Sequence, residues 1–240
     1  MTLVALAGGS GKLGRIIRTV LDETPGYEVT TVLGSASSPA DIAGADLVVD
    51  ATNLEASEKI VREAIARGIP ALVATSGWSA EKIAEIAPLA DDAGVAVVII
   101  PNFSLGSVIG SRIAAQAAKF FPFAEIIESH RDTKIDSPSG TAVRTAELIA
   151  AGRTEPVQAP NADQPARGEL TAGVPVHSLR RPGVIAQQQV ILSGPGESLV
   201  IQHDTADPQA AYAPGIRLAL AGINGTTGVA VGLDNFLELS

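Results

Sequence analysis

The stretch Thr2-Leu3-Val4-Ala5-Leu6-Ala7-Gly8-Gly9-Ser10-Gly11-Lys12-Leu13-Gly14 decides the fold. Its first six residues form a short apolar run typical of a buried strand, and the residues after the glycines show the apolar spacing of an amphipathic helix. Glycines at 8, 11 and 14 allow a tight turn, close approach of the backbone to a pyrophosphate, and close contact between helix and strand. The N–H groups at the start of such a helix bind anions. This context favours a dinucleotide-binding loop over a plain strand–helix turn.

Downstream of this loop, short apolar runs alternate with helix-spaced segments to about residue 100. We expect strands at Thr2–Ala7, Glu28–Leu33, Asp46–Asp50, Ile69–Thr75 and Val95–Ile100. We expect helices at Leu13–Leu21, at Leu54–Arg67, and from a cap at Ser79 to Asp92. Strands separated by helices predict right-handed βαβ units and a parallel sheet. Residues 1–104 are therefore predicted to be a Rossmann domain of the α/β class.

After Pro101 the pattern changes. It predicts helices at Leu105–Phe121, Thr141–Ala151 and Gln209–Ala221. It predicts strands at Glu125–Ser129 and near Val176–Arg180, Val184–Leu192 and Leu199–His203. Residues Gly152–Gly173 are expected to form a loop, and an apolar run follows at Val229–Leu233. Strands this close in sequence favour a mixed or antiparallel sheet. We expect a second α+β domain at 105–207, and we expect residues 208–240 to return to the first domain.

Composition narrows the function. The 240 residues are 46% hydrophobic but only 3% aromatic, which predicts an aliphatic core under parallel strands. A net charge of −9 disfavours nucleic acid as a partner. The absence of cysteine excludes disulfides and thiolate chemistry, and the three histidines lie too far apart in sequence to predict a metal site. Neither a signal-like start nor a membrane-spanning run is visible, so we expect a cytoplasmic protein.

The end of the second predicted strand bears on the choice of dinucleotide. Sites that prefer NADH usually place an acid there to bind the ribose 2′-hydroxyl, but Gly34 and Ser35 follow the strand here. Hydroxyls and a cation suited to a 2′-phosphate lie nearby, on Ser35, Ser37, Ser38 and Lys12. An ordinary polar loop explains the serines equally well. The pattern leans toward NADPH over NADH.

A polar loop after the strand at 125–129 carries the second cluster of functional residue types. His130 follows the strand, Arg131 and Lys134 add two cations to an acidic protein, and Ser139 precedes the helix as its expected N-cap. The N–H groups at the start of that helix, with the hydroxyls of Ser139 and Thr141, suit a carboxylate. A proton donor, a cation and an anion site together favour a substrate site over a solvated basic loop.

Residues 128–142 resemble a known signature. They read Glu-Ser-His-Arg-Asp-Thr-Lys-Ile-Asp-Ser-Pro-Ser-Gly-Thr-Ala, similar to the E-x-H-H-x-x-K-x-D-x-P-S-G-T-A of the 4-hydroxy-tetrahydrodipicolinate reductase (dihydrodipicolinate reductase) family. The resemblance continues through the glycine loop, Asp50-Ala51-Thr52, Ala74-Thr75-Ser76-Gly77, Pro101-Asn102-Phe103-Ser104 and Val174–Arg180. It implies NAD(P)H-dependent reduction of a cyclic imine dicarboxylate in lysine and diaminopimelate biosynthesis. It also implies a homotetramer whose C-terminal domain serves substrate binding and assembly.

The resemblance implies a role for each matching residue. His130 is the proton donor, and Lys134 stabilises charge on the substrate. The substrate carboxylates contact Arg131, Lys134, Ser139, Gly140 and Thr141. The cofactor contacts Gly8, Gly11, Lys12, Leu13, Gly14 and Gly34, and its nicotinamide lies against Ala74, Thr75, Ser76, Pro101, Asn102 and Phe103.

The sequence departs from the family pattern in four respects. Arg131 replaces the second histidine, and Ala74-Thr75-Ser76-Gly77 replaces the usual Gly-Thr-Thr-Gly. Gln187 stands where relatives often carry a further histidine, and the acid after the second strand is absent. The departures leave open a paralogue that reduces another cyclic imine or unsaturated acid. A regulator that binds NAD(P)H without turnover is a further alternative, but it would need neither His130 nor Lys134.

Overall fold

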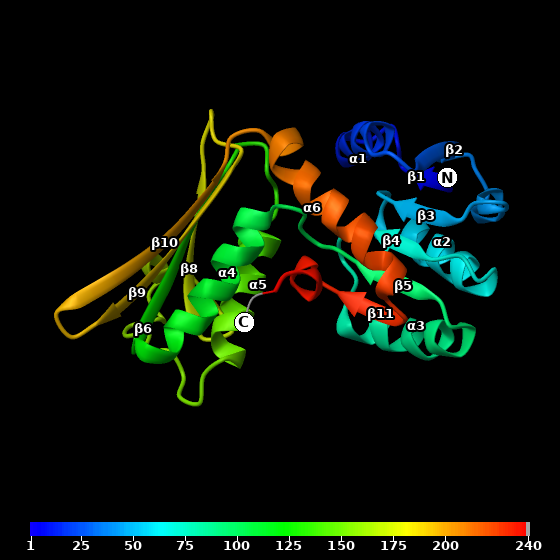
Figure 1. The fold of residues 1–240 in the computed structure, drawn as a ribbon. Helices are drawn as coiled ribbons and strands as arrows, with labels where there is room; N and C mark the ends of the chain where they lie inside the picture. The colour runs from blue at the N-terminus through cyan, green and yellow to red at the C-terminus, as the bar shows by residue number, and fades with distance from the viewer. Residues whose placement is uncertain (239–240) are drawn as a thin grey trace. The chain divides into compact units, whose positions relative to one another are not determined.

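The computed structural model describes residues 1–238 and divides the chain into two compact units (Figure 1). Unit 1 comprises Met1–Phe103 together with the chain from Tyr212 onward, and unit 2 comprises Ser104–Ala211. Within residues 1–238, no helix is both long and apolar enough to cross a lipid bilayer.

Unit 1 is built on a six-stranded sheet with the order β11-β5-β4-β3-β1-β2. Every neighbouring pair is parallel, which confirms the predicted Rossmann-like sheet. The strands are β1 (Thr2–Ala7), β2 (Tyr27–Leu33), β3 (Leu47–Asp50), β4 (Ala71–Val73), β5 (Ala96–Ile99) and β11 (Gly228–Val231). The apolar run near the C-terminus thus supplies β11, which pairs with β5 at the edge of the sheet.

Two of the helices of unit 1 begin at capping side chains. The helices are α1 (Lys12–Glu23), α2 (Leu54–Ala66), α3 (Ala80–Ala93) and the part of α6 (Pro208–Gly222) that lies in this unit, with short 3-10 turns η1 (Pro39–Ile42), η4 (Ile223–Gly225) and η5 (Leu233–Phe236). The side chain of Asn53 caps α2 and that of Ser79 caps α3 by accepting backbone N–H bonds. Gly94 ends α3 in the left-handed conformation.

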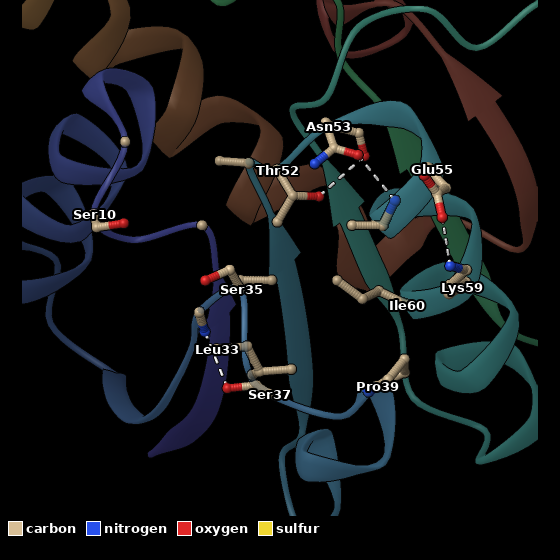
Figure 2. A pocket seen from close by; sticks show the side chains of 16 residues that line it. Ser10, Leu33, Ser35, Ser37, Pro39, Thr52, Asn53, Glu55, Lys59 and Ile60 are labelled. Carbon is tan, nitrogen blue, oxygen red and sulfur yellow. Dashed lines mark hydrogen bonds and ion pairs between the residues drawn. The ribbon is translucent and has the colours of Figure 1, made fainter.

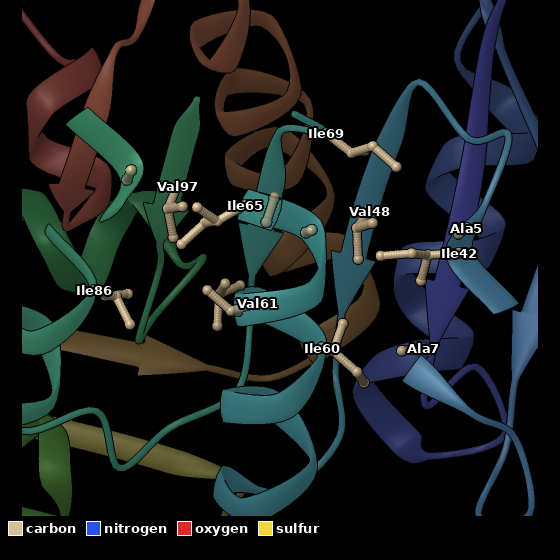
Figure 3. Packing of buried hydrophobic residues seen from close by; sticks show 14 of the residues in the cluster. Ala5, Ala7, Ile42, Val48, Ile60, Val61, Ile65, Ile69, Ile86 and Val97 are labelled. Carbon is tan, nitrogen blue, oxygen red and sulfur yellow. The ribbon is translucent and has the colours of Figure 1, made fainter. Parts of the chain in front are cut away.

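The core of unit 1 is aliphatic, as the low aromatic content predicts. Val61 and Ile65 of α2 face Val48 of β3 and Val97 of β5 (Figure 3), and all four side chains are buried. Burial of such a side chain contributes about 1.5–3 kcal/mol. This packing holds the carboxyl ends of the parallel strands, and the loops that follow them, in fixed positions.

Unit 2 contains a five-stranded mixed sheet with the order β10-β9-β6-β8-β7. The strands are β6 (Phe123–His130), β7 (Glu169–Thr171), β8 (Val174–Arg180), β9 (Ala186–Gly194) and β10 (Glu197–Thr205). Strands β6 and β8 are parallel, and the other pairs are antiparallel. Helices α4 (Leu105–Ala117) and α5 (Gly140–Ala151) cover one face of the sheet, with η2 (Ala118–Phe120) after α4 (Figure 1).

Two sequence expectations need correction in unit 2. The segment 152–173 is not all loop, because it contains η3 (Pro165–Arg167) and the edge strand β7. A strand of three residues is too short to show a pattern and forms by pairing with β8. His130 is the last residue of β6 and does not lie beyond it.

Side chains along β6 alternate between the two faces of the sheet, and this alternation places a charged residue in the core of unit 2. Ala124 and Ile126 face the helices and are buried together with Ile149 of α5 and Val176 of β8. Glu128 is the next residue on this face, and it is also fully buried. A buried carboxylate requires partners, and these partners define the site in unit 2.

Candidate active site

A cavity of about 560 Å³ lies at the carboxyl ends of β1, β2 and β3 in unit 1 (Figure 2). In an open parallel sheet this is the edge at which ligands bind. Three glycines predicted to bind the cofactor line it, namely Gly8, Gly11 and Gly34. The rest of the lining consists of Ala7, Ser10, Leu33, Ser35, Ser37, Pro39, Ala51, Thr52, Asn53, Glu55, Ala56, Lys59 and Ile60.

The glycine loop has the close backbone contacts that a dinucleotide cradle needs. Gly8 has a φ of +78°, and a Cβ there would lie 2.3 Å from the carbonyl oxygen of Ala51. A Cβ on Gly14 would lie 2.1 Å from the carbonyl oxygen of Gly8, because the first turn of α1 packs directly on the loop. Real Cβ atoms do not approach backbone oxygens this closely, so both positions require glycine. These residues fit a bound pyrophosphate.

The wall of the cavity beyond β2 contains the predicted Ser35 and Ser37, but its cation is Lys59 and not the predicted Lys12. Figure 2 shows Ser35 and Ser37 on one side and Glu55 and Lys59 of α2 on the other. Lys59 Nζ lies 2.7 Å from Glu55 Oε1. Ser37 Oγ accepts a hydrogen bond from the N–H of residue 34, at 3.1 Å.

Three residues at the start of α1 that were predicted to contact the cofactor do not line this cavity: Lys12, Leu13 and Gly14. Ser38 also lies outside the lining, and its side chain caps η1. Lys59 is the cation that the cavity does contain. The sequence signal that could have found it is its place one turn after Glu55, in the helix that follows the third strand.

The residues predicted to contact nicotinamide follow two adjacent strands of unit 1. Ala74–Ser76 come directly after β4, and Pro101–Phe103 follow β5 closely. Thr75 is buried, and its Oγ1 accepts a hydrogen bond from the N–H of Thr52 at 2.9 Å. Neither segment lines the described cavity, so their contact with nicotinamide stays a prediction.

In unit 2, a buried carboxylate holds His130. The Oε2 atom of Glu128 lies 2.5 Å from His130 Nδ1. Arg180 donates to both oxygens of the same carboxylate, at 3.0 and 2.9 Å. Strand register explains the grouping, because His130 of β6 pairs directly with Arg180 of β8, and Glu128 lies two residues earlier on the same face.

The charge state of Glu128 follows from these contacts. Burial alone would raise the pKa of this carboxyl group, but hydrogen bonds from His130 and Arg180 outweigh burial and lower the pKa to about 2. The group is therefore ionised at neutral pH. Because Nδ1 of His130 is engaged, Nε2 is the ring nitrogen left for a ligand.

The loop after β6 carries the predicted substrate residues. Lys134 Nζ lies 2.7 Å from each carboxylate oxygen of Asp136, and this hydrogen bond is the main reason that the pKa of Asp136 is lowered. Ser139 is the N-cap of α5, as predicted: its Oγ accepts from the N–H of residue 142, and its own N–H donates to Glu128 Oε1 at 3.3 Å. Gly140 and Thr141 form the first turn of α5, and Arg131 is exposed at the start of the loop.

Gln187 belongs to a different surface. It pairs with Ser129 across β6 and β9, which places it on the opposite sheet face from Glu128. Its side chain donates to Asp204 at 2.5 Å and accepts from Arg181 at 2.9 Å. This departure from the family pattern therefore does not alter the Glu128–His130 contact.

Comparisons with protein families and with individual relatives point to the same family. Residues 2–103 match the family described as "Dihydrodipicolinate reductase, N-terminus", and residues 106–237 match "Dihydrodipicolinate reductase, C-terminus". The chain is 47% identical over 241 residues to the 4-hydroxy-tetrahydrodipicolinate reductase of Clavibacter michiganensis subsp. michiganensis, covering 99% of this chain and 87% of that protein. It is 37% identical over 246 residues to the enzyme of the same name from Streptomyces griseus subsp. griseus, covering 99% and 98%.

Solved structures give the same picture. The dipicolinate-bound dihydrodipicolinate reductase from Paenisporosarcina sp. TG-14 is similar with a TM-score of 0.85 at 28% identity, over 99% of this chain and 100% of that one. The amine dehydrogenase from Mycobacterium smegmatis is similar with a TM-score of 0.69 at 12% identity, over 100% and 97%. The second likeness shows a shared fold alone.

Proposed function

The chain belongs to the 4-hydroxy-tetrahydrodipicolinate reductase (dihydrodipicolinate reductase) family, and from this premise we propose how its residues carry the reaction. It is an NAD(P)H-dependent oxidoreductase of lysine biosynthesis. The observation that carries this conclusion is similarity over the whole chain, through both halves of the family and at 47% identity to one relative.

The proposed substrate site lies in unit 2. A dicarboxylate is bound by Lys134 and by the start of α5, through the N–H groups of Gly140 and Thr141 and the hydroxyls of Ser139 and Thr141. Arg131 adds an exposed cation that can bind a carboxylate in two-pronged fashion. Lys134 is already paired with Asp136, so an incoming carboxylate exchanges one anionic partner for another. His130 donates the proton from Nε2, the nitrogen that Glu128 leaves unoccupied.

The proposed cofactor site lies in unit 1. The loop at Gly8, Gly11 and Gly14 holds the pyrophosphate, and the cavity wall at Ser35, Ser37 and Lys59 faces the adenosine ribose. When bound there, NAD(P)H supplies the hydride for the reduction. Support for NADPH over NADH comes from the absence of an acid directly after β2 and from Lys59 in the lining. Glu55 is the acid in that wall and forms an ion pair with Lys59, so binding of a 2′-phosphate exchanges one anionic partner of Lys59 for another.

A direct assay tests the reaction. Dihydrodipicolinate is generated in situ, and the absorbance of NADPH is followed after addition of the protein. We expect rapid oxidation of NADPH. Tight binding of NADPH without oxidation would contradict the proposal and favour a regulator. Oxidation only with another cyclic imine or unsaturated acid would indicate a paralogue with a different substrate.

We also propose that the protein is a homotetramer assembled through unit 2. Support comes from apolar side chains that remain exposed on its strands, among them Val200 at 51% and Leu179 at 42%. Both lie on the sheet face opposite to Glu128, away from α4 and α5.

A further inference from the structure

Glu128 connects three parts of the proposed substrate site. Its carboxylate contacts the ring of His130, the guanidinium of Arg180, and the N–H of Ser139 at the start of α5. Arg180 also donates to the carbonyl oxygen of Asp136 at 2.5 Å, which ties the same cluster to the loop that carries Lys134. One buried carboxylate therefore links the proton donor, the loop and the helix terminus.

We propose that Glu128 is a positioning residue that fixes the ring of His130 with Nδ1–H toward its own carboxylate and Nε2 directed to the substrate. The proposal rests on the proposed function of His130 as the proton donor. Glu128 itself touches neither the substrate nor the cofactor in this assignment. Arg180 is a second positioning residue, because it keeps the Glu128 carboxylate charged and in place.

The chemistry of the contact determines the tautomer. An ionised carboxylate can only accept hydrogen bonds, so the proton shared across the 2.5 Å contact belongs to Nδ1 of His130. The neutral ring then carries its lone pair on Nε2, and the protonated ring carries its transferable proton there. During the reaction, the Nε2–H bond breaks and the proton passes to the substrate. The neutral Nδ1–H ring remains and recovers a proton from water.

The geometry of Arg180 explains why the carboxylate stays in place. Its two-pronged contact uses both oxygens of Glu128, which fixes the plane of the carboxylate and therefore the position of the Oε2 atom that holds His130. A lysine at this position would supply the charge without the fork. The side chain of Arg180 is only 19% exposed, so solvent screens the pair weakly.

The chain contains a matched control on the same strand. Glu125 lies on the opposite face of β6 and contacts His177 Nε2 at 2.8 Å, and Arg167 donates to the same carboxylate. This second set of glutamate, histidine and arginine has no role in the proposed reaction. It engages Nε2 where the first engages Nδ1, so the two histidines are expected to show opposite tautomers.

Nitrogen NMR of protein labelled with ¹⁵N-histidine tests the proposal without substrate. At a pH where the rings are neutral, we expect the Nδ1–H form for His130 and the Nε2–H form for His177. The chain has three histidines, and H130N assigns the signal. In E128Q, the His130 signals should move toward a mixture of tautomers while those of His177 stay unchanged. An Nε2–H form of His130 in the wild type would overturn the proposal.

Steady-state kinetics give the second readout. We expect E128Q to lower kcat about 10- to 100-fold, by analogy with the loss seen when a carboxylate partner of a metal-bound histidine is removed. The KM for NADPH should stay near the wild-type value, and E125Q should keep the wild-type kcat. Wild-type kcat in E128Q would overturn the proposal. Absence of turnover in the wild type, with the expected NMR tautomer, would instead contradict the proposed function.

A second variant covers the case in which E128Q fails to fold because Arg180 loses its anion. The double variant E128Q/R180M removes both charges together, and circular dichroism checks its fold. We expect it to lose the tautomer preference of His130 and the same 10- to 100-fold in kcat. A folded double variant with wild-type tautomer and kcat would overturn the proposal.

Discussion

His130 is engaged by Glu128 in unit 2 and does not line the cavity of unit 1, so its replacement should separate proton donation from cofactor binding. We expect His130→Ala to lower kcat by about 10²–10⁴-fold, the usual contribution of general acid catalysis. The dissociation constant of NADPH, measured by fluorescence titration, should stay near the wild-type value. A variant with wild-type turnover would remove His130 from the mechanism.

Lys134 and Thr141 each offer one contact to a dianionic substrate. Loss of a charge-assisted hydrogen bond costs roughly 1.5–3 kcal/mol, or about ten-fold or more in affinity. We therefore expect Lys134→Ala and Thr141→Val to raise the KM for substrate by that factor. Lys119→Ala is a matched control, because this exposed lysine of unit 2 donates a hydrogen bond to Gln116 and has no role in the proposed substrate site. Unchanged saturation curves for both test variants would refute the carboxylate site.

Gly34 sits in the cavity wall where an acid would select NADH. A Cβ there meets nothing within 4 Å, so Gly34→Asp fits without rearrangement. The new carboxylate would accept from the 2′-hydroxyl of NADH and repel the 2′-phosphate of NADPH. The loop is exposed and screened by salt, so we expect about a ten-fold shift toward NADH, or about 1.4 kcal/mol.

The measurement for this position is kcat/KM with each cofactor, in the wild type and in Gly34→Asp. Gly34→Asn keeps the size without the charge and should shift the ratio far less. A strong preference of the wild type for NADH would show that the residues after β2 do not determine cofactor choice as proposed.

Among the secondary structure elements, β1 with α1 and β6 with α5 could be predicted because their signals are local. Apolar strands followed by glycines, or by a capped helix, need no knowledge of distant residues. The parallel sheet of unit 1 and the capping role of Ser139 were predicted on this basis and are confirmed. The roles assigned to individual site residues stay predictions.

The partners of His130 could not be predicted, because they depend on strand register. Arg180 lies 52 residues after Glu128 and meets it only because β8 pairs in parallel with β6. Glu128 did leave a signal in the sequence: it follows Ala124 and Ile126 at alternate positions, which places a charge on an apolar face. Lys59 was missed since its place in the cavity depends on how α2 packs beside the loop after β2.

The contact between α1 and the glycine loop allows a test at the scale of an element. A Cβ on Gly14 would lie 2.1 Å from the carbonyl oxygen of Gly8, and backbone cannot yield as a flexible side chain can. We expect Gly14→Ala to displace the loop and raise the KM for NADPH at least ten-fold, about 1.4 kcal/mol. Gly225→Ala is the control, because a Cβ there meets nothing within 4 Å. Equal KM values for Gly14→Ala and the control would contradict this account of the loop.

For the whole molecule, the proposed assembly predicts a mass. Light scattering coupled to size-exclusion chromatography should give four times the chain mass of 24.4 kDa. Val200 is half exposed on β10, and a charge there would be desolvated in an interface between copies. We expect Val200→Lys to lower the mass of the assembly in solution. Val32 of β2 in unit 1 is equally exposed, at 52%, and Val32→Lys should leave that mass unchanged. A monomeric wild type would refute the tetramer.

Acid stability of the whole molecule should depend on Glu128. Its pKa is lowered from 4.5 to about 2 in the folded protein, so its contribution is fully present above the unfolded pKa and is lost as pH falls toward 2. At 1.36 kcal/mol per pKa unit, the loss is about 3 kcal/mol. The pKa values of Glu125 and Asp136 are also lowered, but these two groups contribute the same pH dependence of stability to the wild type and to a variant of Glu128.

The comparison that isolates Glu128 is urea unfolding of the wild type and Glu128→Gln between pH 5 and pH 2, at one protein concentration. At pH 5 the variant should be less stable, because Arg180 and His130 lose a charged partner. Toward pH 2 the wild-type carboxylate is protonated as well, so the difference in unfolding free energy should shrink by about 3 kcal/mol. A difference that stays constant over this range would show that Glu128 does not remain ionised through its contacts with Arg180 and His130.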